Sequence, residues 1–99
     1  DKTLTFYAAA WKGEPMTVYI KIENGGSVTG VTEISAKTND LVAGSVTDTI
    51  ELTEEYLCTF NITGLTEEST ITIATDSECK GNVSINKKAR GIMCGFKLK

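Results

Sequence analysis

The sequence predicts an all-β, antiparallel β-sandwich or barrel of about seven to eight short strands, formed as a single domain over residues 1–99. In five segments, apolar residues recur at every second position, which is the period of a strand with one buried face. Threonine is the commonest residue, with 15 of 99, and proline occurs once. Because threonine is β-branched, it favours a pleated surface over a helix. Short strands separated by frequent turns are typical of sandwiches and barrels.

The five strongly alternating segments are Leu4–Ala10, Val18–Ile22, Tyr56–Ile62, Ile71–Ile73 and Ile92–Leu98. In the first and last of them the even-numbered residues are the more apolar set, so we expect these residues to face the core. Together the five segments supply more than a dozen apolar side chains. At about 1.5–3 kcal/mol for each fully buried side chain, this core is large enough to fold without disulfides.

Weaker strands are expected at Val28–Ser35, Val46–Leu52 and Asn82–Ile85. Residues that favour turns separate the strands, and at Asn24-Gly25-Gly26 they tolerate a positive φ, which predicts a hairpin. Short helical turns could form at Thr66–Ser69 and Leu41–Gly44. The other predicted turns are Lys12–Pro15, Asn24–Ser27, Asn39–Gly44, Gly64–Ser69 and Asp76–Asn82.

Composition excludes several classes of function. The chain has no histidine, so Ser-His-Asp and Cys-His nucleophiles and histidine-ligated zinc are absent. Ten basic residues against thirteen acidic ones give a net charge of −3, which does not suit a nucleic-acid phosphate backbone. No apolar run is long enough to span a membrane. We therefore expect a domain that is not an enzyme, needs no cofactor or metal, and belongs to a longer protein.

Three cysteines allow one disulfide at most. Cys58 and Cys94 fall on apolar faces of predicted strands, so we expect two buried, inert thiols. A bridge between them requires neighbouring strands with Cα atoms within about 7 Å. Cys79 lies between charged residues and is expected to be exposed and reactive. We favour three unpaired thiols.

The order of these features resembles the jelly-roll, galactose-binding-like domain found at the C-terminal ends of surface and secreted proteins of Bacteroides-type bacteria. The matching segments are Leu4–Gly13, Thr17–Glu23, Asn24-Gly25-Gly26, Tyr56–Leu65, Thr70–Ala74 and Ala89–Leu98. The resemblance implies a jelly-roll-like sandwich, export to the cell surface, extracellular space or periplasm, and a role in carbohydrate binding or adhesion.

The chain departs from this family in two places. The family's last strand often carries two acidic residues after an arginine and a short aromatic stretch. Here Arg90 fits the first position, but Cys94 and Gly95 stand in place of the acids. A jelly roll also usually has a strand before Leu4, so we expect the domain to be trimmed there or to lack its first strand.

The aromatic residues Tyr7, Trp11 and Tyr19 form the candidate ligand-binding set. If the turn at Lys12–Pro15 makes a simple hairpin, Tyr7 lies opposite Tyr19, with Trp11 about 13 Å along the strand. Exposed rings on one sheet face can stack on sugar rings. In the structural alternative, Trp11 closes the end of the sandwich and the tyrosines are an ordinary cross-strand pair. Successive strands in opposite sheets would separate the two tyrosines.

Acidic residues cluster in the predicted turns and strand ends, but they form no loop of the calcium-binding kind. Adjacent glutamates also point in different directions, so they do not make the facing carboxylates of a glycosidase. We expect the glutamates paired at strand ends to form a solvated rim. The clustered acidic residues are Glu51, Glu54, Glu55, Glu67 and Glu68, with Asp76 and Glu78 further along the chain.

Two functions are therefore expected as alternatives. The first is a non-catalytic accessory binding module of an exported protein, carbohydrate-binding or adhesive, with a glycan as its partner. The second is a structural spacer that packs against a neighbouring domain of the same chain.

Overall fold

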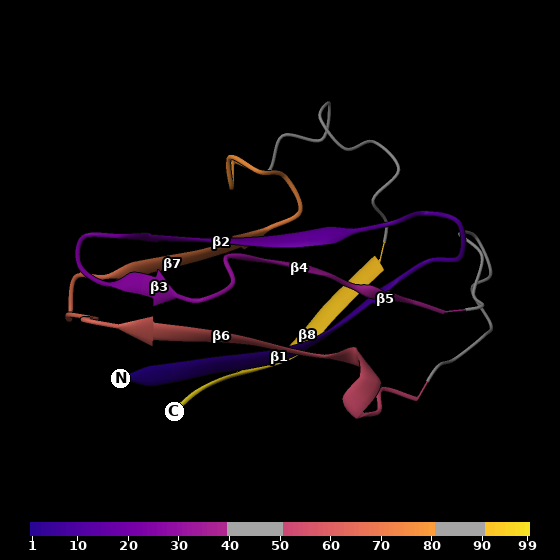
Figure 1. The fold of residues 1–99 in the computed structure, drawn as a ribbon, viewed down its shortest axis with the longest axis horizontal. Coiled ribbons are helices and arrows are strands. Elements are labelled where there is room, and N and C mark those ends of the chain that lie inside the picture. Colours follow the sequence, from indigo (N-terminus) through magenta and orange to yellow (C-terminus); the bar gives the residue numbers. More distant parts are fainter. Residues whose placement is uncertain (40–50, 81–90) are drawn as a thin grey trace.

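The computed structural model describes residues 1–39, 51–80 and 91–99, which form two packed β-sheets (Figure 1). Sheet A has five strands and sheet B has three, which confirms the predicted all-β sandwich. Sheet A contains β1 (Lys2–Ala10), β3 (Ser27–Thr29), β5 (Lys37–Thr38), β6 (Leu57–Thr63) and β8 (Gly91–Leu98). Sheet B contains β2 (Thr17–Glu23), β4 (Glu33–Ser35) and β7 (Thr70–Ala74).

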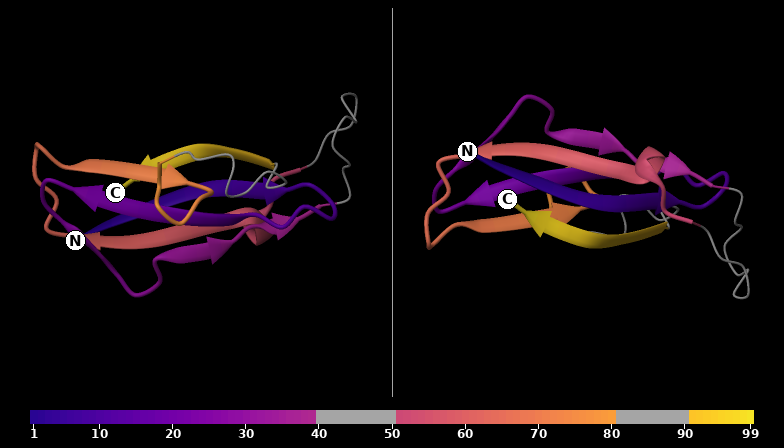
Figure 2. Two further views of the ribbon diagram at one scale, coloured as in Figure 1. Left: turned by 90° about the horizontal axis from the view of Figure 1, so that it is seen from above. Right: turned by 90° about the horizontal axis from the view of Figure 1, so that it is seen from below.

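β1 is the central strand of sheet A. Along one of its edges, residues 2–7 pair with β6 and residues 9–10 pair with β5. The other edge pairs with β8. The short β1–β5 pairing is parallel, whereas the other pairings are antiparallel. Seen from below in Figure 2, β6, β1 and β8 lie side by side, with sheet B behind them. In Figure 1 sheet B is the upper layer and sheet A the lower one.

The core lies between the two sheets and follows the predicted alternation in β1 and β6. The side chains of Phe6 and Phe60 are completely buried, and their ring centroids lie 6.0 Å apart. Sheet B covers them with Val18 and with half-buried isoleucines of β2, β4 and β7. The buried cluster consists of Leu4, Phe6, Ala8, Ala10, Met16, Val18, Ala36, Cys58, Phe60 and Ile62.

The chain crosses between the sheets at its first two turns, so neither turn makes a hairpin. β1 leads to β2 in the other sheet, and β2 leads to β3, which returns to sheet A and pairs with β6. The hairpin predicted at Asn24-Gly25-Gly26 is therefore wrong, although these residues do have positive φ angles. The loop before β7 holds this turn, since Thr66 Oγ1 donates to the Asn24 carbonyl (3.0 Å) and Ser69 Oγ to the Gly25 carbonyl (2.6 Å).

The last strand does not keep the predicted alternation, because a β-bulge interrupts it. Gly95 has a φ of 70°, and the register with β1 shifts between Thr5 and Tyr7. Such a bulge places two residues opposite one and reverses the faces beyond it. Met93 therefore packs against the core, whereas Ile92 and Cys94 turn outward, so their predicted inward orientation is wrong.

The weaker predictions have mixed outcomes. The segment Val28–Ser35 contains two short strands, β3 and β4, which belong to different sheets. Residues 46–50 and the segment Asn82–Ile85 lie outside the described residues, as does the predicted helical turn Leu41–Gly44. The segment Thr66–Ser69 forms a hydrogen-bonded turn and not a helix. A 3-10 turn, η1 (Glu54–Tyr56), precedes β6 and was not predicted.

Candidate functional site

The outer surface of sheet A, which we call the A face, carries the candidate site. Because directly paired residues share a face, the register identifies its members from Thr5 and Tyr7, which alternate with the buried residues of β1. The A face includes Thr3, Thr5, Tyr7 and the completely buried Ala9 of β1, Leu57, Thr59 and Asn61 of β6, Thr29 of β3, Ile92, Cys94 and Lys97 of β8, and Lys37 of β5.

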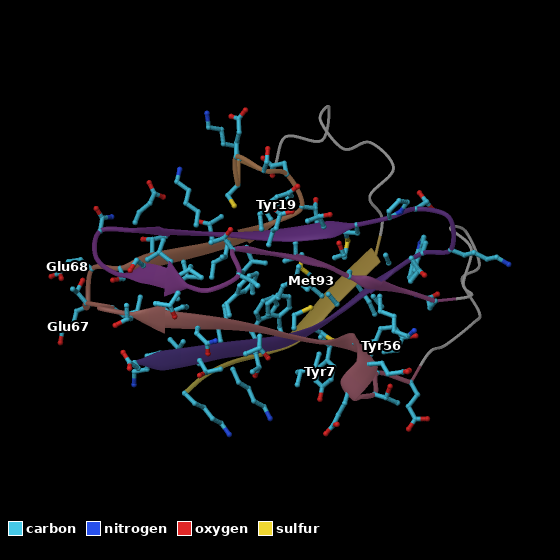
Figure 3. All side chains as sticks on the ribbon, in the orientation of Figure 1. Tyr7, Tyr19, Tyr56, Glu67, Glu68 and Met93 are labelled. Carbon is cyan, nitrogen blue, oxygen red and sulfur yellow. The ribbon has the colours of Figure 1, made fainter. Side chains whose placement is uncertain are left out.

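Aromatic and apolar side chains gather at one end of the A face. Tyr7 is half-buried and pairs with Leu57, whose side chain is 41% exposed. The preceding residue, Tyr56, ends η1, which contacts β1. The Lys37 Nζ lies 6.0 Å from the centroid of the Tyr56 ring, within the range of a cation–π contact. Figure 3 shows Tyr7 and Tyr56 on the lower side of the molecule beside η1.

The opposite end of the A face is polar and hollowed. A depression of about 330 Å³ is lined by Asp1, Lys2, Thr3, Thr29, Asn61, Ile62 and Thr63. Thr63 Oγ1 donates to the Asp1 carboxylate over 2.9 Å, and Thr29 Oγ1 donates to the Asn61 carbonyl over 3.4 Å. Thr5 and Thr59, which face each other across β1 and β6, connect this hollow to the aromatic end. The A face therefore combines hydroxyl and amide groups with aromatic rings.

Tyr7, Trp11 and Tyr19 were expected to share a surface, but the topology separates them. Tyr19 belongs to β2 of sheet B, where it pairs with Glu33 and Ala74, so it does not lie opposite Tyr7. Figure 3 shows Tyr19 on the upper side of the molecule and Tyr7 on the lower side. Trp11 is half-buried just beyond β1, in a turn where its carbonyl accepts from the Glu14 amide (3.0 Å). The shared platform is not formed, because β1 and β2 belong to opposite sheets.

Several residues on or beside the A face were missed by sequence reasoning. Tyr56 was placed in the predicted strand Tyr56–Ile62, whereas it closes η1. A signal was present, since Thr53 followed by Glu54 and Glu55 resembles a helix start. Lys37 and Asn61 gave no such signal, because only the pairing of distant strands brings them beside β1.

The three cysteines are unpaired in the structure. Cys58 is buried as predicted, and burial raises the pKa of its thiol. Cys94 is exposed on the A face beside Tyr7, so the prediction that it is buried is wrong. Cys79 is partly buried. Desolvation is the main cause that raises the pKa of its thiol, and the Asp76 carboxylate raises it further, whereas Lys21 lowers it by a smaller amount. The prediction that Cys79 is exposed and reactive is therefore wrong.

The acidic residues do not converge on a common point. Glu67 and Glu68 are exposed at the tip of the loop between β6 and β7 (Figure 3). Asp76 is only 2% exposed and has a structural role, since its Oδ2 accepts from the Lys80 amide (2.9 Å) and its carbonyl from the Cys79 amide (3.0 Å). Within residues 1–39, 51–80 and 91–99, no group of three potential metal ligands comes together.

Comparison of the chain with protein-family models, with curated proteins and with solved structures finds no match. In the part of the chain that the structure describes, no helix has the length and apolar character needed to cross a membrane.

Proposed function

We propose that this domain is a non-catalytic binding module of an exported protein and that its A face binds a glycan. The observation that carries the proposal is the joint presence of Tyr7 and a row of hydroxyl and amide groups on one sheet surface, with the Tyr56 ring near Lys37 of the same surface. Sugars present both apolar C–H faces, which stack on aromatic rings, and hydroxyl groups, which exchange hydrogen bonds with threonine and asparagine side chains. Export is supported by the resemblance of the strand and turn pattern.

The chemistry of the A face supports binding without catalysis. Hydrolysis of a glycosidic bond generally requires two carboxylates that flank the bond. The five strands of sheet A contain neither Asp nor Glu. Thr3, Thr5 and Tyr7 follow one another along β1, so a ligand would lie parallel to that strand.

The test is affinity electrophoresis of the domain in gels that contain defined polysaccharides. Tyr7→Ala is compared with Tyr19→Ala, which removes the same ring from the outer surface of sheet B. Loss of an aromatic contact worth about 0.5–1.5 kcal/mol should weaken binding about two- to ten-fold in the Tyr7 variant alone. Absence of retardation for the unmodified domain on every polysaccharide would contradict the proposal.

A second candidate function, packing against a neighbouring domain, is favoured by a different observation. The side chains of Phe96 and Leu98, which lie on the same side of β8, are 49% and 47% exposed. Exposed apolar groups that lie close together are typical of interaction surfaces. Under this alternative, Phe96→Ser in the full-length protein should loosen the domain contact, whereas Tyr7→Ala should not. Limited proteolysis of the full-length protein measures this difference.

A further inference from the structure

The two sheets carry opposite charge. The strands of sheet A contain three lysines and no carboxylate, whereas the strands of sheet B contain Lys21 with Glu23 and Glu33. Lys21 is also paired with Glu23, with 3.9 Å between Nζ and Oε2. The protein as a whole has a net charge of −3. The positive charge of sheet A is therefore a local property that the overall composition hides.

The register directs most of this positive charge to the A face. Lys97 pairs with Thr5, and Lys37 pairs with Ala9, so both side chains share the surface that holds Tyr7. Lys99 exchanges backbone hydrogen bonds with Thr3 (2.8 and 3.0 Å), which places it opposite Thr3 on the same surface. The side chains of Lys37, Lys97 and Lys99 are all exposed.

We propose that the ligand of the A face is an acidic polysaccharide whose sugars carry uronate groups. This inference rests on the proposed function and specifies its ligand class. The rings of Tyr7 and Tyr56 would stack on the sugars, while Lys37, Lys97 and Lys99 would pair with their carboxylates. The Lys37 Nζ lies over the Tyr56 ring, 6.0 Å from its centroid, so a cation and an aromatic ring are close enough to contact the same sugar residue.

The spacing of the lysines favours a polymer of moderate charge density. Lys97 lies on β8 and Lys99 one residue beyond its end, about 7 Å apart, and the A face from Thr3 to Ala9 is about 20 Å long. Three charges over that length suit a chain with one carboxylate on each sugar or each second sugar. Duplex DNA, with one charge per about 1.7 Å, presents a far denser array.

Negative groups at the two ends of the A face oppose a more highly charged polyanion. Asp1 lies in the hollow, and Glu54 and Glu55 lie on η1. The glutamates of sheet B have less influence, because sheets pack about 10 Å apart and the screening length in physiological salt is about 8 Å. The local field at Lys97 and Lys37 is therefore set by sheet A.

The test is calorimetric titration of the domain with oligogalacturonate and with a neutral galactan oligosaccharide of equal length. Lys97→Gln is compared with Lys21→Gln, a matched loss of one charge from sheet B. An exposed ion pair strengthens binding about five-fold at most, so Lys97→Gln should weaken oligogalacturonate binding by up to that factor. The Lys37→Gln/Lys97→Gln double variant should lose about ten-fold and show weaker salt dependence, while Lys21→Gln changes affinity less than two-fold.

The outcomes separate this inference from the proposed function. Binding of the galactan that equals or exceeds binding of the oligogalacturonate would overturn the acidic ligand and leave glycan binding in place. Equal binding of a single-stranded DNA oligonucleotide would also overturn it, since the A face would then be a general polyanion surface. Failure to bind oligogalacturonate would also overturn the acidic ligand, whereas glycan binding itself is contradicted only when the electrophoresis shows no retardation on any polysaccharide.

Discussion

β1 and β8 are hydrogen-bonded neighbours in sheet A with similar alternating sequences, but they differ sharply in burial. β1 is completely buried from Ala8 to Ala10, whereas Met93 is the one residue of β8 that is not exposed. β1 has strands on both edges, and within the described residues β8 pairs only with β1. Alternation therefore shows which residues can share a face, while the place of the strand in the sheet decides how much of that face is covered.

The bulge at Gly95 adds a second difference between the two strands. β1 keeps its even-numbered residues inward from Leu4 to Ala10. In β8 the inward positions are Phe96 and Leu98 on one side of the bulge and Met93 on the other. Cys94 and Ile92 consequently join the A face beside Tyr7 and Ala9. One glycine thus changes both the core and the candidate site.

The largest expected effect is on stability, and it distinguishes the two stacked rings of Phe6 and Phe96. Their centroids lie 4.8 Å apart, with 15° between the ring planes. Phe6→Ala should lower the free energy of unfolding by about 3–5 kcal/mol, because Phe6 is completely buried. Phe96→Ala should cost only about 1–2 kcal/mol, from a half-buried side chain and one aromatic contact. Urea denaturation measures both values. Equal losses would show that β8 is as well covered as β1.

A smaller effect is expected from Gly95→Ala. The φ of 70° is unfavourable for alanine, and the added Cβ would lie 3.1 Å from Cδ2 of Tyr7. Gly13→Ala is the matched control, since Gly13 has a φ of 74° and open space around its Cα. We expect thermal unfolding to show a loss of about 1 kcal/mol for Gly13→Ala and about 2 kcal/mol for Gly95→Ala. If Gly13→Ala were the more costly variant, the bulge would not constrain Tyr7.

The smallest effect concerns reactivity and not stability. Cys94 is exposed, whereas Cys58 is buried and burial raises the pKa of its thiol. Since the thiolate is the reactive form, a disulfide reagent at neutral pH should modify Cys94 first and Cys58 only when the chain opens. Mass spectrometry after short labelling identifies the modified residue, and Cys94→Ser should remove the fast phase. Slow labelling of Cys94 would mean that its outward register is wrong, and fast labelling of Cys58 would mean that this thiol is not buried.

The predictable part of the fold is its local part. The alternation of Leu4, Phe6, Ala8 and Ala10 was enough to identify a half-buried strand and its inner face, because side-chain direction in a strand follows directly from backbone geometry. The positive-φ turn at Asn24-Gly25-Gly26 was predictable for the same reason. In both cases the information lies within a few neighbouring residues.

The candidate site was predictable only in part. Tyr7 was correctly placed on an outer surface, but its expected partner Tyr19 lies across the sandwich, and its neighbours are Leu57, Tyr56 and Cys94. The turn at Lys12–Pro15 does not reveal whether the chain stays in one sheet or crosses to the other. That choice depends on which strands can bury their apolar faces against each other, and this involves residues far apart in the sequence.

The amino-acid sequence alone determined the strand class, the inner face of most strands and the lack of histidine chemistry, since each follows from residue type and short-range period. The tertiary structure alone decided that β1 and β2 separate, that Gly95 shifts the register of β8, and that Lys37 and Lys97 share a surface with Tyr7, with the Tyr56 ring near Lys37. The physical reason is that burial and strand pairing are long-range: a side chain's direction is set by its own backbone, but its neighbours are set by the whole chain.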